Sequence, residues 1–205
     1  MMKAKLTPLY AATALLMLGA GSAFAESTIE GDVEINVQTE NVISASIGDG
    51  NTSEVSIGSI SDSEVGGDVT IDVTTGNVIS AAIGDDNTST VNIGSVKGSE
   101  VEGDVQIEVN TENVISAAIG SDNTSEVNIG SIVDSELGGD ATISVETGNV
   151  ISAAIGDGNT SEVSVGSVKE SEVGGDVNIS VTAGNIISAA IGSDNTSKVS
   201  VGSIE

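Results

Sequence analysis

The sequence predicts an all-β fold, a β-solenoid of five 36-residue repeats, and three observations support this prediction. First, close copies of "NVISAAIGDDNTSTVNIGSV" recur at intervals of 36 residues. Second, stretches such as "VTIDV" at residues 69–73 alternate apolar and polar side chains, which is the period of a half-buried strand. Third, Gly, Asp and Asn gather between these stretches, as is typical of turns. Units of this length bury their apolar face only by stacking on their neighbours.

Each repeat is expected to contain three main strands and one short strand. In the second repeat these fall near residues 69–74, 78–83, 89–93 and 96–101, with turns at 66–68, 75–77 and 84–87. A weaker half-period also exists, because residues 76–84 and 94–102 align at Gly, Val and one further apolar position. Two 18-residue coils per repeat are therefore an alternative to one 36-residue rung, and the sequence leaves both open.

The core is predicted from positions that do not vary between copies, since a stacked core needs the same volume in every rung. The clearest such column contains Ile35, Ile71, Ile107, Ile143 and Ile179. The strand at 78–83 is apolar on both faces, with Ile-Ala-Ile on one and Val-Ser-Ala on the other. We expect one face to fill the core and the smaller Val-Ser-Ala face to contact another layer of the coil or a neighbouring molecule.

Residues 1–25 are predicted to be a secretory signal peptide. They begin with Lys3 and Lys5, continue with a short apolar run and end on Ala23-Phe24-Ala25. The repeats fill residues 26–205, which leaves no room for a second domain, and we expect neither end to carry a cap. The mature chain is therefore expected to be extracellular or at the cell surface, without membrane insertion.

The composition after residue 25 excludes several classes of function. The only cations there are Lys97, Lys169 and Lys198, against 31 acidic residues, a formal charge of −28. Such a surface repels nucleic acid and anionic membranes. No His or Cys is present, and the carboxylates are spread evenly over equivalent copies, so we expect no enzyme and no cofactor.

Two columns of asparagine recur at the turns. Stacked amides form hydrogen-bonded ladders that fix register, and Asn also tolerates the backbone of tight turns. The first column contains Asn41, Asn77, Asn113, Asn149 and Asn185, and the second contains Asn51, Asn87, Asn123, Asn159 and Asn195.

Acidic residues at the Gly-x-x-Asn turns are weak candidates for calcium ligands, because calcium favours several carboxylate oxygens. They are Asp49, Asp85, Asp86, Asp122, Asp157 and Asp194, and the alternative is that they simply solvate the turns. A further acidic column contains Asp32, Asp68, Asp104, Asp140 and Asp176.

An uncapped ladder with cohesive edges is expected to stack end to end on copies of itself. The residues predicted to meet at the junction are Val33, Ile35, Val199, Val201 and Ile204. The leading hypothesis is therefore a structural subunit of an extracellular amyloid-like fibre. One alternative is an adhesin-like or calcium-dependent binding solenoid that acts as a monomer or a small oligomer. A remote one is ice binding through the column Thr52, Thr88, Thr124, Thr160 and Thr196.

The turn at residues 84–94, Gly-x-x-Asn-x-Ser-x-Val-x-Ile-Gly, resembles the curlin repeats of bacterial curli, with Ile93 where curlin has Gln. The resemblance covers about half of each repeat. It implies a secreted subunit that polymerises into adhesive biofilm fibres, with cell-surface secretion or nucleation proteins as partners. The segment "AIGDDNTSTVNIG" at residues 82–94 also looks like the head repeats of trimeric autotransporter adhesins.

Overall fold

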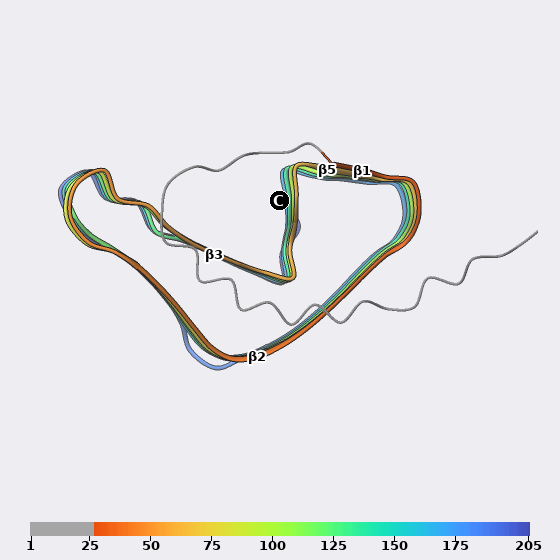
Figure 1. The fold of residues 1–205 in the computed structure, drawn as a ribbon, viewed down its shortest axis with the longest axis horizontal. Coiled ribbons are helices and arrows are strands. Elements are labelled where there is room, and N and C mark those ends of the chain that lie inside the picture. Colours follow the sequence, from red (N-terminus) through yellow and green to blue (C-terminus); the bar gives the residue numbers. More distant parts are fainter. Residues whose placement is uncertain (1–26) are drawn as a thin grey trace, which may run out of the picture.

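The computed structural model describes residues 27–205, which form a β-solenoid of five rungs and no helix. Every strand pairs in parallel with the strand 36 residues away, so that Val69 lies between Val33 and Val105. The predicted all-β solenoid is confirmed, and the alternative of two 18-residue coils per repeat is wrong. In the view down the solenoid axis the rungs nearly superimpose (Figure 1). The predicted signal peptide lies outside the described residues.

Four parallel sheets run along the axis, and each rung contributes a strand to all of them, except that the last rung joins sheet D only through the bridge between Val168 and Ile204. Sheet A contains β1 (Ser27–Ile29), β5 (Ser63–Val65), β9 (Glu100–Val101), β13 (Glu136–Leu137) and β17 (Glu172–Val173). Sheet B contains β2 (Val33–Ser46), β6 (Val69–Ala82), β10 (Val105–Gly120), β14 (Ala141–Gly156), β18 (Val177–Ala183) and β19 (Ile186–Gly192). Sheet C contains β3 (Ser53–Ile57), β7 (Ser89–Ile93), β11 (Glu126–Ile129), β15 (Glu162–Val165) and β20 (Lys198–Val201). Sheet D contains β4 (Ile60–Ser61), β8 (Val96–Lys97), β12 (Ile132–Val133) and β16 (Val168–Lys169).

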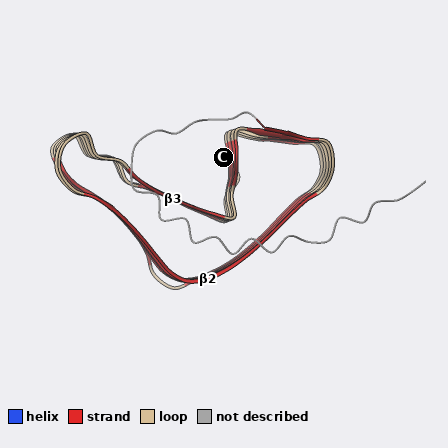
Figure 2. Cartoon of the chain, viewed as in Figure 1, coloured by secondary structure: helices blue, strands red, loops and turns tan. Residues whose placement is uncertain are grey.

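In each of the first four rungs one long strand replaces two strands that we expected to be separate, whereas the fifth rung has two, β18 and β19. A turn was predicted at residues 75–77, but β6 runs without a break from Val69 to Ala82. The chain bends inside it instead, where the pairing skips position 40 and its equivalents (Figure 2). We call residues 33–39 of each rung the first arm and residues 42–47 the second arm, with their equivalents at intervals of 36. The single short strand that we predicted at residues 96–101 is instead divided into two strands, β8 and β9.

The first arm has the alternation that the sequence predicts. Val69, Ile71 and Val73 of β6 are fully buried, whereas Thr70 and Asp72 between them are exposed. The turn that joins sheets C and D packs against this arm and requires glycine. Its backbone has a φ near +56° at Gly94, where a Cβ would lie 2.5 Å from a methyl carbon of Val109. Glycine alone permits both the conformation and the contact.

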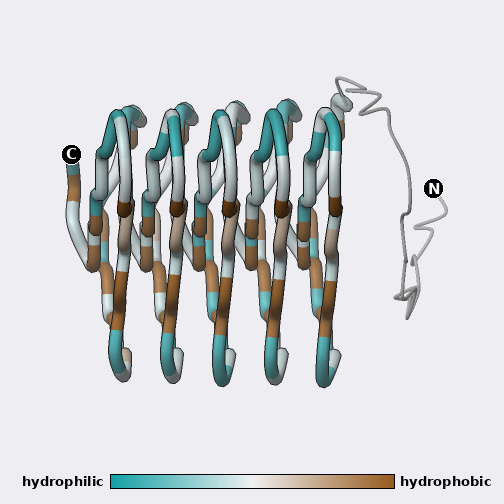
Figure 3. Tube along the Cα trace, turned by 90° about the vertical axis from the view of Figure 1, so that its left-hand side faces the viewer, coloured by the Kyte–Doolittle hydropathy of each residue, from teal (hydrophilic) through white to brown (hydrophobic). Residues whose placement is uncertain are grey.

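The second arm differs from our expectation in which of its two faces points into the molecule. Val78, Ser80 and Ala82 are fully buried, and they face sheet C of the same coil, which is one of the two options predicted for this face. The Ile-Ala-Ile face, which we expected in the core, points outward instead, with Ile79 and Ala81 only half-buried. The space between this arm and sheet C is filled by small side chains. Apolar segments of successive rungs lie in line along the axis (Figure 3).

No helix in residues 27–205 is long and apolar enough to cross a membrane.

Candidate assembly interface

The two end rungs present open strand edges with exposed apolar side chains. At the C-terminal edge Val199, Val201 and Ile204 are 47%, 41% and 66% exposed, whereas their equivalents in the third rung are fully buried. At the other edge Val33 and Ile35 are half-buried, against about full burial of their equivalents in the middle rungs. The predicted junction residues thus lie on the two opposite edges of the solenoid and do not meet within one chain.

Register shows that the predicted junction set is incomplete. Val33 and Ile35 belong to columns that end in Val177 and Ile179, not in Val199 and Val201. The columns of Val199, Val201 and Ile204 begin at Val55, Ile57 and Ile60. The missing residues could have been found by moving each candidate by four repeat lengths, or 144 positions, along the chain.

The two asparagine columns stack as continuous hydrogen-bonded ladders. In the column that begins at Asn41, each Nδ2 donates to the Oδ1 of the preceding rung at 2.8 to 3.0 Å. In the column that begins at Asn51 the corresponding distances are 2.5 to 2.8 Å. The second column is buried in the middle rungs, and its amides also donate to a carbonyl two residues earlier, as Asn159 does to Asp157. This column therefore combines the ladder with turn chemistry.

A third ladder, which the sequence interpretation missed, consists of serine hydroxyls between the second arm and sheet C. Consecutive Oγ atoms lie 2.8 to 3.0 Å apart and zigzag through every rung. Its members are Ser44, Ser53, Ser80, Ser89, Ser116, Ser125, Ser152, Ser161, Ser188 and Ser197. A chain of this kind satisfies buried hydroxyls and polarises along its length. The signal in the sequence was an invariant Ser on a face that otherwise holds Val and Ala.

The acidic column that begins at Asp32 accepts hydrogen bonds from the backbone. Each Oδ1 takes the N–H of the equivalent Asp in the next rung, at 3.1, 2.9, 2.8 and 2.7 Å along the column. Close approach of the rungs depends on the glycine before each Asp, because a Cβ at Gly103 would lie 2.4 Å from Oδ1 of Asp68. Backbone donors thus offset the repulsion between stacked carboxylates. In the last rung, Asp176 presents its carboxylate at the open edge.

The six calcium candidates all lie exposed in the loops between sheets B and C. Their positions shift between neighbouring loop residues from rung to rung, since Ser121 and Ser193 stand where Asp49, Asp85 and Asp157 stand in other rungs. Asp49, Asp85 and Asp157 have φ values of 48°, 69° and 72°, which Asp tolerates better than most residues. Within residues 27–205 no group of three or more acidic side chains converges on a point where a metal ion would bind. The backbone of these loops is that of tight turns, and calcium binding by them stays a prediction.

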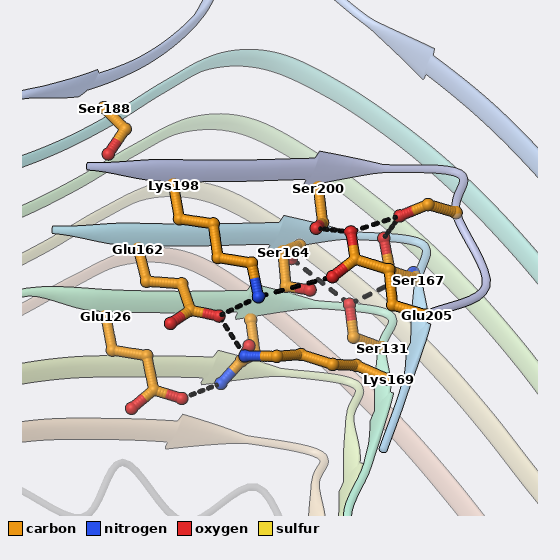
Figure 4. Close-up of polar contacts among 12 residues, drawn as sticks. Glu126, Ser131, Glu162, Ser164, Ser167, Lys169, Ser188, Lys198, Ser200 and Glu205 are labelled. Carbon is orange, nitrogen blue, oxygen red and sulfur yellow. Dashed lines mark hydrogen bonds and ion pairs between the residues drawn. The ribbon is translucent and has the colours of Figure 1, made fainter. Parts of the chain in front are cut away.

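Lys169 and Lys198 lie on the side of the molecule where sheet C meets sheet D (Figure 4), and Lys97 lies on sheet D two rungs before Lys169. Lys97 lies 3.3 Å from Glu126, and Lys169 forms a hydrogen bond and an ion pair with Glu162. Burial opposes the charge of Lys169, but the hydrogen bond with Glu162 and its negative charge outweigh burial and raise the pKa of Lys169. These contacts pair the few cations of a strongly acidic chain.

Lys198 is the cation nearest to the open C-terminal edge. Its Nζ lies 3.3 Å from Glu205 in its own rung and 4.0 Å from Glu162 in the rung before. Hydrogen bonds from Ser200 and Lys198 lower the pKa of Glu205. In the parallel register of sheet C, the column of Lys198 runs through Glu162, Glu126 and Thr90 to Glu54 at the opposite edge. The two ends of this column carry opposite charges.

Comparisons with family models, with curated proteins and with solved structures find no match for this chain.

Proposed function

We propose that this chain is a secreted structural subunit that assembles end to end, last rung on first rung, into an extracellular amyloid-like β-fibre of a biofilm matrix or adhesive filament. The observation that carries the proposal is the strict register of the solenoid, in which every residue pairs with its equivalent 36 positions away. Adding a copy with this register repeats a contact that the chain already makes four times between its own rungs. The unpaired backbone groups of both edges would be satisfied in the process.

Several columns would continue across such a junction without a mismatch. Asp176 would accept the N–H of Asp32 in the next copy, as the Asp residues of preceding rungs do. Ser197 would extend the hydroxyl zigzag to Ser44. These contacts favour one polarity and one register over all others.

The junction is also complementary in charge. Lys198 of one copy would lie beside Glu54 of the next, in the place where Lys198 already approaches Glu162 on its other side. Opposite charges at a junction between strongly acidic chains steer association and disfavour wrong registers.

The remaining features suit a structural role. The turn pattern resembles that of curlin repeats, and residues 26–205 contain no His or Cys and no aromatic residue. We propose that the chain needs no cofactor and acts on no substrate.

The first experiment is to purify residues 26–205 in denaturant, dilute the denaturant away, and image by negative-stain electron microscopy with calcium and with chelator. We expect uniform unbranched fibres in both conditions, with a cross-β reflection at about 4.8 Å. Discrete particles of constant size at high concentration would contradict the proposal, and fibres only with calcium would favour the calcium-dependent binding solenoid.

The second experiment exchanges the charges of the junction. Lys198→Glu and Glu54→Lys are each expected to slow fibre growth, because each places like charges at the junction. The double variant restores the opposite pair and is expected to recover the original growth rate. Lys198→Glu also removes the contacts of Lys198 with Glu205 and Glu162 inside the chain, so circular dichroism checks that each variant folds. Equal growth rates of all four folded proteins would show that this pair does not set the junction.

A further inference from the structure

The outer face of the second arm is an apolar surface in a molecule that is otherwise acidic. Its outward positions are Ile-Ala-Ile in every rung, and none of them carries a charge. At the end rungs Ile43, Ile47, Ile187 and Ile191 are 63%, 75%, 49% and 59% exposed. The outward positions of the first arm, by contrast, carry acids such as Glu34 and Glu108. Two acidic copies would meet along their sides with least repulsion through this face.

The face has a relief that repeats along the axis. Two columns of Ile flank one column of Ala, and neighbouring columns are about 6.6 Å apart, since they are two residues apart along a strand. The rungs superimpose with little twist, so these columns run straight along the axis (Figures 1 and 3). Flat sheets of this kind are usually stabilised by side-chain ladders, which this chain has, or by stacking against another sheet. The face therefore presents two ridges and one groove.

We infer that this face binds the same face of a second copy, with an Ile ridge of each copy seated in the Ala groove of the other. The inference rests on the proposed end-to-end fibre and states how two such fibres pair side by side. Ridge and groove match because both copies have the same spacing between rungs, which a partner without this repeat lacks. A dry, interdigitated contact of this type is the steric zipper of stacked sheets.

The area of the face decides when pairing occurs. Four residues along the strand and five rungs give a face of about 13 by 24 Å, or roughly 300 Å², so that two copies bury about 600 Å² in total. Stable complexes bury about 1,200 Å² or more, so single copies are expected to stay unpaired. In a fibre the faces of successive copies add up, so about two copies in a row reach this threshold and about three exceed it. Pairing is therefore expected to follow elongation.

The inference is tested by filling the groove while keeping it apolar. The groove-filled variant carries Ala81→Leu, Ala117→Leu and Ala153→Leu. A second variant removes one ridge through Ile79→Ser, Ile115→Ser and Ile151→Ser. The control changes outward residues of the first arm in the same strands, through Thr70→Ala, Gln106→Ala and Thr142→Ala. Circular dichroism and the cross-β reflection check that each variant folds, and scanning transmission electron microscopy gives the mass per length of its fibres.

Fibres of the unmodified chain and of the control are expected to have the mass per length of two filaments, and both second-arm variants half of it. Thicker or unchanged fibres of the groove-filled variant would show nonspecific apolar adhesion and overturn the inference, while the end-to-end fibre stands. Single filaments of the unmodified chain would also overturn it and would leave the face free for another partner. Absence of any fibre from the unmodified chain would overturn the proposed function together with this inference.

Discussion

The two arms of the long strand have the same backbone pairing but differ in where their largest apolar side chains lie: the first arm buries its Ile, whereas the second arm buries Val, Ser and Ala and turns its Ile outward. In the third rung, Ile107 of the first arm is fully buried and Gln106 beside it is exposed. In the second arm of the same strand, Ser116 is fully buried and Ile115 is partly exposed. The first arm thus stabilises the rung through its apolar core, and the second arm combines a hydroxyl ladder inside with an apolar surface outside. The first half of the strand therefore contributes most to the stability of the rung, and the second half forms its apolar outer surface.

The largest effect is expected from removing the same atoms on the two arms. Ile107→Ala leaves a cavity in the core and is expected to lower the free energy of unfolding by about 2–5 kcal/mol. Ile115→Ala, eight residues along the same strand, removes an outward side chain and is expected to cost less than about 1 kcal/mol. Urea unfolding of the unassembled chain, followed by far-UV circular dichroism, measures both. Equal losses would mean that the second arm contributes to the core as the first does.

The hydroxyl ladder gives the next effect. Ser116→Ala removes a buried Oγ that lies 2.9 and 3.0 Å from those of Ser89 and Ser125, and leaves both without this partner. The expected cost is about 1–3 kcal/mol. Ser144→Ala, on the exposed face of the first arm, is expected to change stability by less than about 0.5 kcal/mol. The same urea titration compares the two, and a neutral Ser116→Ala would show that the ladder only fills space.

The smallest effect is expected where the two arms meet. Asn149 belongs to the exposed asparagine ladder beside the bend, whereas Asn159 in the same rung belongs to the buried one. Asn149→Ala is expected to cost about 0.5–1 kcal/mol, since water replaces its hydrogen bonds. Asn159→Ala is expected to cost more, because it leaves buried partners unpaired. Equal values in urea unfolding would indicate that burial of the ladder does not matter.

The sequence predicted the period, the strand character and the asparagine columns, because these depend on alternation and repetition along one chain. It did not determine which face of the second arm is inside. Alternation yields two faces, and the width of the gap to the facing sheet decides between them. Here the gap fits Val78, Ser80 and Ala82, so the more apolar Ile79 and Ile83 lie outside.

Two other features were equally hidden in the sequence. The half-period of 18 residues does not correspond to a structural repeat, because the aligned glycines have different roles. Gly76 lies inside a long strand, whereas Gly94 lies in a turn with positive φ. The gathering of the lysines on one side of the molecule depends on the angle between sheets C and D, which no local pattern encodes.

The central claim is that the last rung of one copy lies in register on the first rung of the next. The most direct measurement uses the absence of cysteine from the chain, by joining Lys198→Cys with Glu54→Cys in one protein. Within one chain the two positions are four rungs, or about 19 Å, apart, too far for the Cα separation of about 4.4–6.8 Å that a disulfide needs. Across the proposed junction they are neighbours.

Assembled fibres of this variant are oxidised and then denatured without reductant for gel electrophoresis. A ladder of covalent dimers, trimers and longer chains is expected, and the control pair Lys198→Cys with Thr90→Cys, two rungs apart across the junction, is expected to remain monomeric. Fibres that yield only monomers, or equal ladders from both pairs, would contradict end-to-end stacking in this register.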